Sequence, residues 1–310
     1  MYAVGRIILA GSHDKDFRQS LQLVFLHRLV TWIMNEPPSQ PKNLRVVLIC
    51  HHDAPIHFDG IARWLASWAN LAGVVVIREP RKVLARRLRR EWQRVGTFRL
   101  LDVLAFRFWY RFSHSRGDTE WLAQRQQQLN ATYGPFDAAT PKLEVSSPNS
   151  PESQRFIEQA KPDLIIALCK NILSERIFGI ARRGAIVFHP GVCPEYRNAH
   201  GCFWALASDD LERVGLTVLK IDRGIDTGPV LGYFQAKYDE VRDTHVRIQH
   251  QVVLDNLDGI RELLVRFHSG EAGAIDVTGR KSHEWGQPWL SAYWRWKSSA
   301  RRRRHAHHRA

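Results

Sequence analysis

Apolar and polar positions alternate along the middle of the chain with the periods expected for strands and helices. The apolar runs Arg45 to Cys50 and Gly73 to Ile77 predict two buried strands, and the stretch Phe58 to Asn70 between them predicts a helix. A strand–helix–strand unit of this kind implies a parallel sheet covered by helices. The pattern therefore predicts an α/β fold, with a mostly parallel sheet and helices on both of its faces.

The same alternation resumes at Leu143. Asp243 or Thr244 is expected to cap one long helix that Gly270 closes, because a capping side chain precedes the apolar stripe and a glycine follows it. The other predicted elements are strands at Asp163 to Leu168, Ala185 to Phe188 and Leu216 to Ile221, and helices within Pro148 to Gln159 and Ser174 to Ile180. Residues 44–270 are thus predicted to form the main domain.

Three segments differ from this pattern. Residues 1–43 are predicted to be an N-terminal extension, with a strand at Arg6 to Ala10 and a helix that ends before Asn35. Residues 82–116 carry apolar side chains at helical spacing between arginines, which predicts a basic helical insertion. Residues 271–310 form a basic, Trp-rich C-terminal tail, and we expect a disordered, solvated arm after Trp296.

Composition and charge narrow the choice of partners. With 44% hydrophobic and 25% charged residues the chain is an ordinary globular protein, and we expect it in the cytoplasm because it shows no secretory signal and no long uncharged apolar run. The net charge of +14 is concentrated in two patches, Arg78 to Arg116 and Arg295 to Ala310. The first patch is expected to be a docked helix pair with a solvated Arg face or a surface that lies on the inner face of the membrane. Nucleic acid is less favoured.

The four cysteines show no CxxC pair, and we expect reduced thiols. Two histidines and two cysteines fall within fourteen residues and are candidate zinc ligands, but their spacing matches no common zinc module. We therefore predict no metal site. The four residues are His189, Cys193, His200 and Cys202.

Candidate chemistry follows two of the predicted strands. His189 comes directly after the strand that ends at Phe188, and Pro190 and Gly191 after it fix a turn. A polar loop with two carboxylates, Asp222 to Pro229, follows the strand that ends at Ile221. Ligands of open α/β sheets bind beyond the carboxyl ends of the strands. A lone histidine or a Gly-rich turn is usually structural, but the two together indicate a site.

The order and spacing of five motifs resemble the core of the folate-dependent formyltransferases, the catalytic domains of methionyl-tRNA, glycinamide ribonucleotide and amino-sugar formyltransferases. The resemblance extends over about Asp163 to Leu257. The motifs are His189-Pro190-Gly191, Pro194-Glu195-Tyr196-Arg197, Trp204-Ala205-Leu206, Gly215-Leu216-Thr217-Val218 and Asp222-Arg223-Gly224-Ile225-Asp226-Thr227-Gly228-Pro229-Val230.

This resemblance implies a Rossmann-like fold and transfer of the formyl group of 10-formyltetrahydrofolate, the co-substrate, to an amine. It also implies that His189 is the catalytic histidine and Asp226 the catalytic aspartate. An imidazole stabilises the oxyanion that forms when the amine attacks, and a carboxylate holds that imidazole. The pterin is expected between two loops that include Cys169, Lys170, Asn171, Ile172, Asp222 and Gly224.

The chain departs from the family at one position. Members of the family have Asn two residues before the catalytic histidine, where this chain has Val187. Loss of such an oxyanion donor costs roughly 10²–10³ in rate in other enzymes. Asn198 or His200 is expected to supply a replacement donor or to contact the acceptor. The alternatives are a relative that transfers another one-carbon or acyl group and a catalytically impaired folate or nucleotide-sugar binding protein.

The expected acceptor is an amino sugar, linked to a nucleotide or a lipid. A methionyl-tRNA formyltransferase-like protein is an alternative that ranks lower, because such an enzyme would need a C-terminal β-barrel of about a hundred residues, whereas only forty-one residues follow from Gly270. Glycinamide ribonucleotide formyltransferase has no use for the Arg-rich insertion. The basic patches instead suit a diphosphate or an anionic membrane. A basic interaction protein, in which the α/β core is only a scaffold, is the remaining alternative.

Overall fold

The computed structural model describes residues 43–79 and 83–307 of the 310-residue chain. The strand and the helix predicted within the first 35 residues lie outside this part.

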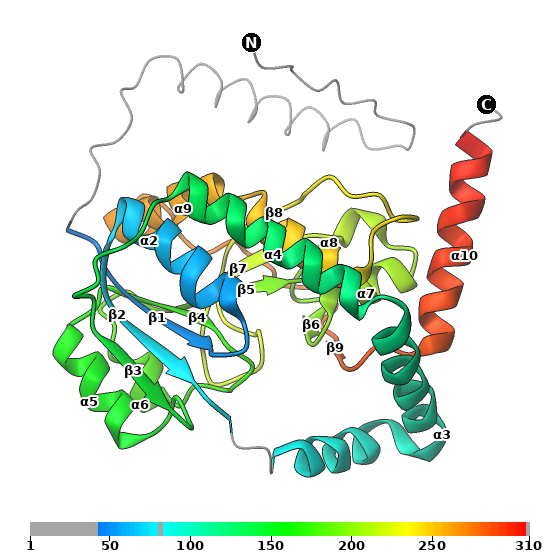
Figure 1. Ribbon diagram of the computed structural model, residues 1–310, viewed down its shortest axis with the longest axis horizontal. Coiled ribbons are helices and arrows are strands. Elements are labelled where there is room, and N and C mark those ends of the chain that lie inside the picture. The colour runs from blue at the N-terminus through cyan, green and yellow to red at the C-terminus, as the bar shows by residue number, and fades with distance from the viewer. Residues whose placement is uncertain (1–42, 80–82, 308–310) are drawn as a thin grey trace. The chain divides into compact units, whose positions relative to one another are not determined.

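Within the described residues the core is a seven-stranded sheet with strand order β3-β2-β1-β4-β5-β7-β8 (Figure 1). The first five strands in this order are parallel, and β7 is antiparallel to both of its neighbours. The predicted mostly parallel α/β fold is confirmed. The strands are β1 (Arg45–His51), β2 (Asn70–Ile77), β3 (Lys142–Val145), β4 (Leu164–Leu168), β5 (Gly184–Pro190), β7 (Leu216–Lys220) and β8 (Val230–Phe234).

Helices cover both faces because successive side chains of each buried strand point to opposite sides. In β1, Val46 and Leu48 pack against one core, which includes residues of α2, α4, α7, α8 and α9. Val47 packs on the other side, against α5 and α6. The helical elements are η1 (Ile56–Ile61), α2 (Ala62–Trp68), α3 (Val83–Ser113), α4 (Ser115–Thr132), α5 (Pro151–Ala160), α6 (Glu175–Phe178), α7 (Gly201–Ala207), η2 (Leu211–Arg213), α8 (His245–Leu254), α9 (Leu257–Ser269) and α10 (Leu290–His307).

The single long helix predicted after Thr244 is wrong, because the chain turns between α8 and α9. At the turn the Asn256 side-chain amide donates to the carbonyl of Gln235 at 2.9 Å and to that of Val252 at 3.0 Å. These bonds tie the end of α8 to the segment that follows β8. The predicted ends hold: the Thr244 hydroxyl accepts the N–H of Arg247, and Gly270 adopts a left-handed conformation (φ +88°) after α9.

The tail does not form the disordered arm expected after Trp296. It continues as α10 to His307, and its side chains Tyr293, Trp296 and Ala300 are buried in the core. Arg303 forms ion pairs with Glu240 and Asp209. These carboxylates lie far away in the sequence, so the residues around the Arg run give no sign of them.

Within the predicted basic insertion, Val83–Ser113 form helix α3. Helix α3 bends at Gly96, where φ is +75° and the i to i−4 ladder is interrupted. No helix of the part that the structure describes is long and apolar enough to cross a membrane.

Candidate active site

The imidazole of His189 lies near the end of β5 and is buried between two acceptors. Its Nδ1 lies 3.3 Å from Oδ2 of Asp226, and its Nε2 lies 2.7 Å from the backbone carbonyl oxygen of Tyr196. Only 6% of the His189 side chain is exposed. With an acceptor at each ring nitrogen, this environment favours the doubly protonated imidazolium.

The charges around His189 act in the same direction. Burial alone lowers the pKa of this imidazole, but Asp226, Cys193 and the Tyr196 carbonyl together outweigh it and raise the pKa from 6.5 to about 9. His189 is therefore a cation at neutral pH, ready to donate a hydrogen bond or a proton to a developing oxyanion.

The loop between β7 and β8 carries Asp226 to this histidine. Because β7 is antiparallel to β5, it ends beside Ile186, and the loop folds back so that Asp226 reaches His189. The fold of the loop is fixed internally: the Asp222 carboxylate accepts the N–H of Gly224 at 2.9 Å and the hydroxyl of Thr227 at 2.8 Å. Asp226 itself adopts a left-handed conformation, with φ +51°. The rule that places functional loops together at the carboxyl ends of parallel strands does not predict the contact between Asp226 and His189, because β7 is antiparallel.

Two glycines allow close backbone packing below the imidazole. A Cβ atom on Gly191 would lie 2.8 Å from Nε2 of His189 and 2.7 Å from the Cα of Gly201. Thr217, which is fully buried, connects this turn to β7: its hydroxyl donates to the Gly191 carbonyl at 2.6 Å and accepts the N–H of Cys193 at 2.9 Å. The segment Gly191 to Gly201 is thus held rigidly against the histidine.

Of the two predicted replacement donors, Asn198 lies beside the His189–Asp226 pair. Its backbone N–H donates to Asp226 Oδ2 at 2.8 Å, while its side-chain amide donates to the carbonyl of Trp285 at 2.7 Å. Asn198 has φ +75°, a conformation that asparagine tolerates better than most residues. The backbone of Asn198 therefore fixes Asp226, and its side chain fixes the loop.

His200 and His57 are two buried histidines of low pKa. Burial, together with nearby Lys170 and Arg107, lowers the pKa of His200 to about 4, although Gln249 accepts or donates a hydrogen bond at 3.2 Å. Burial and the neighbouring His250, His51 and Lys170 lower the pKa of His57 to about 3. Lys170 of the predicted pterin loop and His200 of the predicted acceptor region are thus close enough to influence each other.

The predicted pterin loop follows β4. The N–H of Lys170 donates to Nε2 of His51 at 3.0 Å, and the Asn171 amide donates to Glu79 at 3.1 Å. Burial raises the pKa of the Cys169 thiol to about 11, so this thiol stays protonated, while the Ile172 side chain is 61% exposed. At the start of α6, which follows this loop, Glu175 pairs with Arg223 at 2.6 Å. This ion pair connects the two loops expected to enclose the pterin.

The sequence did not indicate the segment that supports the site from behind. Strand β9 (Glu284–Trp285) pairs with β6 (Arg197–Asn198), and the Trp285 ring stacks on Trp204 at 4.6 Å between ring centroids. The Trp285 indole N–H donates to the Glu195 carbonyl at 2.9 Å. The Arg280 guanidinium donates two hydrogen bonds to the Glu195 carboxylate, at 2.9 and 2.6 Å. The cluster of tryptophans after Gly270 was the only sign of this support.

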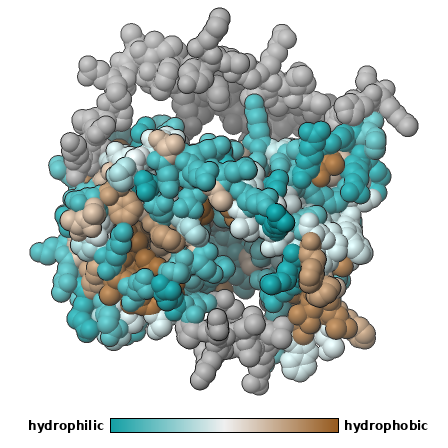
Figure 2. All heavy atoms as spheres, viewed as in Figure 1, coloured by the Kyte–Doolittle hydropathy of each residue, from teal (hydrophilic) through white to brown (hydrophobic). Residues whose placement is uncertain are grey.

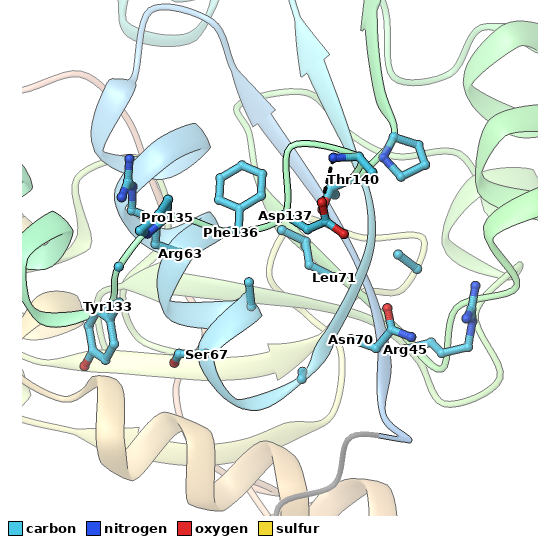
Figure 3. Close-up of a pocket in the computed structure, with 16 residues that line it drawn as sticks. Arg45, Arg63, Ser67, Asn70, Leu71, Tyr133, Pro135, Phe136, Asp137 and Thr140 are labelled. Carbon is cyan, nitrogen blue, oxygen red and sulfur yellow. Dashed lines mark hydrogen bonds between the residues drawn. The ribbon is translucent and has the colours of Figure 1, made fainter.

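A cavity of about 670 Å³ lies elsewhere, at the amino ends of β1 and β2 (Figure 3). Arg45, Asn70, Tyr133 and Phe136 are among its lining residues, and none of the predicted site residues lines it. This cavity is at the edge of the sheet opposite to His189, so it is separate from the candidate active site.

The four cysteines are unpaired. Among the residues that the structure describes, no group of three or more His, Cys, Asp or Glu side chains is arranged to hold a metal ion.

The formyl transferase family matches residues 117–260, the segment that carries His189 and Asp226. This match confirms the resemblance to formyltransferases over that segment.

Three curated relatives illustrate the similarity. GDP-perosamine N-formyltransferase of Brucella melitensis is 24% identical over 130 residues, which are 42% of this chain and 49% of the relative. Methionyl-tRNA formyltransferase of Nitrosomonas eutropha is 37% identical over 92 residues, 29% of each chain. The Thermotoga maritima enzyme of the same name is 33% identical over 131 residues, 42% of this chain and 41% of the relative. The chain spans less than half of the length of these relatives.

Among solved structures, a sugar N-formyltransferase from Shewanella overlaps with 78% of this chain and 76% of its own, at 13% identity and a TM-score of 0.47.

Proposed function

We propose that this protein transfers the formyl group of 10-formyltetrahydrofolate to the amine of an amino sugar that is linked to a nucleotide or a lipid. The observation that carries the proposal is the buried His189–Asp226 pair, with 3.3 Å between Nδ1 and Oδ2, in the segment that matches the formyl transferase family.

In the proposed reaction the acceptor amine attacks the formyl carbon, and a tetrahedral oxyanion forms. The His189 imidazolium stabilises this oxyanion with its Nε2 proton, for which the oxyanion competes with the Tyr196 carbonyl. Asp226 keeps the ring oriented and charged through Nδ1. The C–N bond to the folate then breaks, the folate nitrogen takes up a proton, the amine loses one, and the products are a formamide and tetrahydrofolate.

The residues expected to hold the donor fit that role. The loop Asp222 to Thr227 is fixed by its own hydrogen bonds, and the loop Cys169 to Ile172 presents an exposed apolar side chain, which suits a flat heterocycle. The ion pair of Arg223 with Glu175 holds the two loops close together.

The similarity to GDP-perosamine N-formyltransferase supports an amino-sugar acceptor. The cations around the site support an anionic carrier: Lys170 and Arg107 both lie close enough to His200 to lower its pKa, and a diphosphate would neutralise them. His200, neutral at pH 7, can accept or donate a hydrogen bond to the sugar.

The test is release of tetrahydrofolate from 10-formyltetrahydrofolate, measured with a panel of nucleotide-linked and lipid-linked amino sugars. We expect release with at least one acceptor, and loss of about 10²-fold or more in kcat for His189→Asn and for Asp226→Asn. Matched controls are His305→Asn and Asp258→Asn, which change exposed residues of the same types. Release that survives in both site variants contradicts the proposed roles.

Val187 favours a second candidate, a protein that binds the folate or the nucleotide sugar without turnover. Val187 is half-buried on β5 two residues before His189 and offers no hydrogen-bond donor. Folate binding by the wild-type chain, measured by calorimetry, without release on any acceptor of the panel supports this candidate over the transferase.

A further inference from the structure

Helix α3 is apolar on two opposite faces beyond its bend at Gly96. One face, with Val103 and Phe106, is buried in the core. The other face has large apolar side chains three or four positions apart, which places them on one stripe of a helix. The exposed stripe consists of Phe98 (90% exposed), Leu101 (59%), Leu104 (38%), Phe108 (69%) and Phe112 (71%).

This stripe continues onto α10. Trp294, 54% exposed, lies with its ring 6.1 Å from that of Trp109 in α3, so the two helices present one surface. Figure 2 shows an apolar patch where this half of α3 lies, at the lower right of the view. Six large exposed apolar side chains on one surface are more than a water-facing helix needs, and such patches mark interaction sites.

Exposed arginines lie on the same two helices as the stripe and Trp294. None of these guanidinium groups forms an ion pair with a carboxylate within residues 43–79 and 83–307. Arg116, at the start of α4, is paired with Glu120 and is not counted among them. The exposed arginines without an ion pair are Arg107 and Arg111 on α3, and Arg295, Arg301 and Arg302 on α10, whereas Arg99 lies over the Trp289 ring at 4.1 Å.

We propose that the α3–α10 surface, defined by the stripe, Trp294 and these arginines, docks on an anionic lipid bilayer. The phenylalanines, the leucines and Trp294 enter the interface between headgroups and acyl chains, and the arginines meet the lipid phosphates. The surface thereby lies at the interface of the membrane.

Two other binding partners, a second copy of this chain and a nucleic acid, fit the surface less well. A second copy of this surface would bring two sets of unpaired arginines together, and repulsion between them opposes such a dimer. Nucleic acid would satisfy the arginines and stack on the aromatic rings, but it leaves Leu101 and Leu104 without a partner. An anionic bilayer satisfies the charge and the apolar stripe together.

The location of this surface agrees with an acceptor carried by a lipid, a point that rests on the proposed function. Arg107 of α3 is near His200, and Phe106 contacts the ring of Phe203 in α7, whose first residue follows His200. The stripe is therefore one helix away from the proposed acceptor region. Membrane docking itself does not depend on formyl transfer.

The test uses the full chain and vesicles of phosphatidylcholine, alone or mixed with phosphatidylglycerol, in a flotation assay. We expect binding only to the mixed vesicles and weaker binding at high salt. The triple variant Phe98→Ser/Phe108→Ser/Phe112→Ser is expected to weaken binding about 10-fold or more, as is Arg111→Glu/Arg301→Glu. Matched controls elsewhere on the surface are Ile275→Ser and Arg155→Glu, which are expected to bind like the wild type.

A second measurement reports on the protein while it is bound to the vesicles. An environment-sensitive dye on Phe112→Cys is expected to shift to the blue with mixed vesicles, while the same dye on Ile275→Cys is not. Equal binding to both kinds of vesicle, or equal loss in the controls, overturns the proposal. So does dimerisation or RNA binding that disappears in the triple variant while vesicle binding remains. Tetrahydrofolate release on soluble acceptors, measured in parallel, reports on the proposed function separately.

Discussion

The carboxylate of Asp226 connects the imidazole of His189, 3.3 Å away, to the backbone N–H of Asn198, 2.8 Å away. Three segments meet at this carboxylate: the end of β5, the loop after β7, and the loop that pairs with β9. The position of Asp226 thus depends on parts of the chain that are distant in the sequence, and the strength of its hold on His189 determines the charge of the ring.

This arrangement predicts the pH dependence of the reaction. Because the pKa of His189 is raised to about 9, kcat is expected to fall as pH rises through about 9. Burial lowers the pKa of His189, and the charge of Asp226 is the strongest influence that raises it. Because Asp226→Asn removes this charge, the pKa of His189 is expected to fall. Titration of the His189 ring by NMR in both proteins checks this shift. An unchanged pKa in the variant contradicts the role assigned to Asp226.

The same pair affects stability. The folded-state pKa of His189 exceeds the ordinary value of 6.5, so its stabilisation is fully present below about pH 6.5 and is lost as pH rises through about 9. Its size is on the order of 3 kcal/mol. Denaturant titrations of the wild type and His189→Asn at pH 6 and about pH 10 are expected to converge at the higher pH.

The sequence predicted those parts of the fold that local patterns specify. Nearly continuous apolar runs identified β1, β4 and β5, because parallel strands covered on both faces have this composition. Strand β8 was missed, since it is short, follows Pro229 directly and contains Gly232. The break between α8 and α9 was missed because it depends on a bond from Asn256 to Gln235, twenty-one positions away.

The site was predicted only in part for the same reason. His189 and Asp226 were found from motifs, and the structure brings them together. The support from Trp285 and Arg280 involves contacts across 85 to 90 positions, which no local pattern indicates. The arginines of α10 looked like a free arm because their carboxylate partners, such as Glu240, come from another segment.

Substitutions of Asn198 distinguish the role of its side chain from that of its backbone N–H. Asn198→Gly keeps both the left-handed conformation and the N–H that holds Asp226, so its kcat is expected to stay within about 10-fold of the wild type. Asn198→Val is expected to lose more, because a β-branched residue resists φ +75° and displaces that N–H. If Asn198→Gly loses about 10²–10³ in kcat, the side chain is itself an oxyanion donor.

Val187→Asn restores the amide that formyltransferases have at this position of the motif. Position 187 is two residues before His189 on the same strand, so both side chains point to one face of the sheet. We expect kcat to rise by about 10-fold or more, with an upper limit of about 10²–10³, the contribution of one oxyanion donor in other enzymes. Val187→Leu, which is close to asparagine in size but carries no hydrogen-bond donor, is the control. Unchanged turnover in a folded Val187→Asn protein shows that another group already serves the oxyanion.

The C-terminal segment is predicted to be part of the catalytic unit, and Trp285 tests this. Its ring stacks on Trp204 and on Tyr196, with centroids 4.6 and 5.8 Å away, and its indole holds the Glu195 carbonyl. Trp285→Ala is expected to destabilise the fold by about 2–4 kcal/mol and to lower kcat, because the loop that positions Asn198 and Asp226 loosens.

Trp294→Ala is the matched control, since this residue belongs to the same segment but is 54% exposed and does not contact the loop. Its free energy of unfolding is expected to change by less than about 1 kcal/mol, with kcat on soluble acceptors unchanged. Thermal and denaturant unfolding measure the first effect, and tetrahydrofolate release measures the second. If Trp285→Ala loses stability while kcat stays at the wild-type value, the segment supports the fold alone and the geometry of His189 and Asp226 does not depend on it.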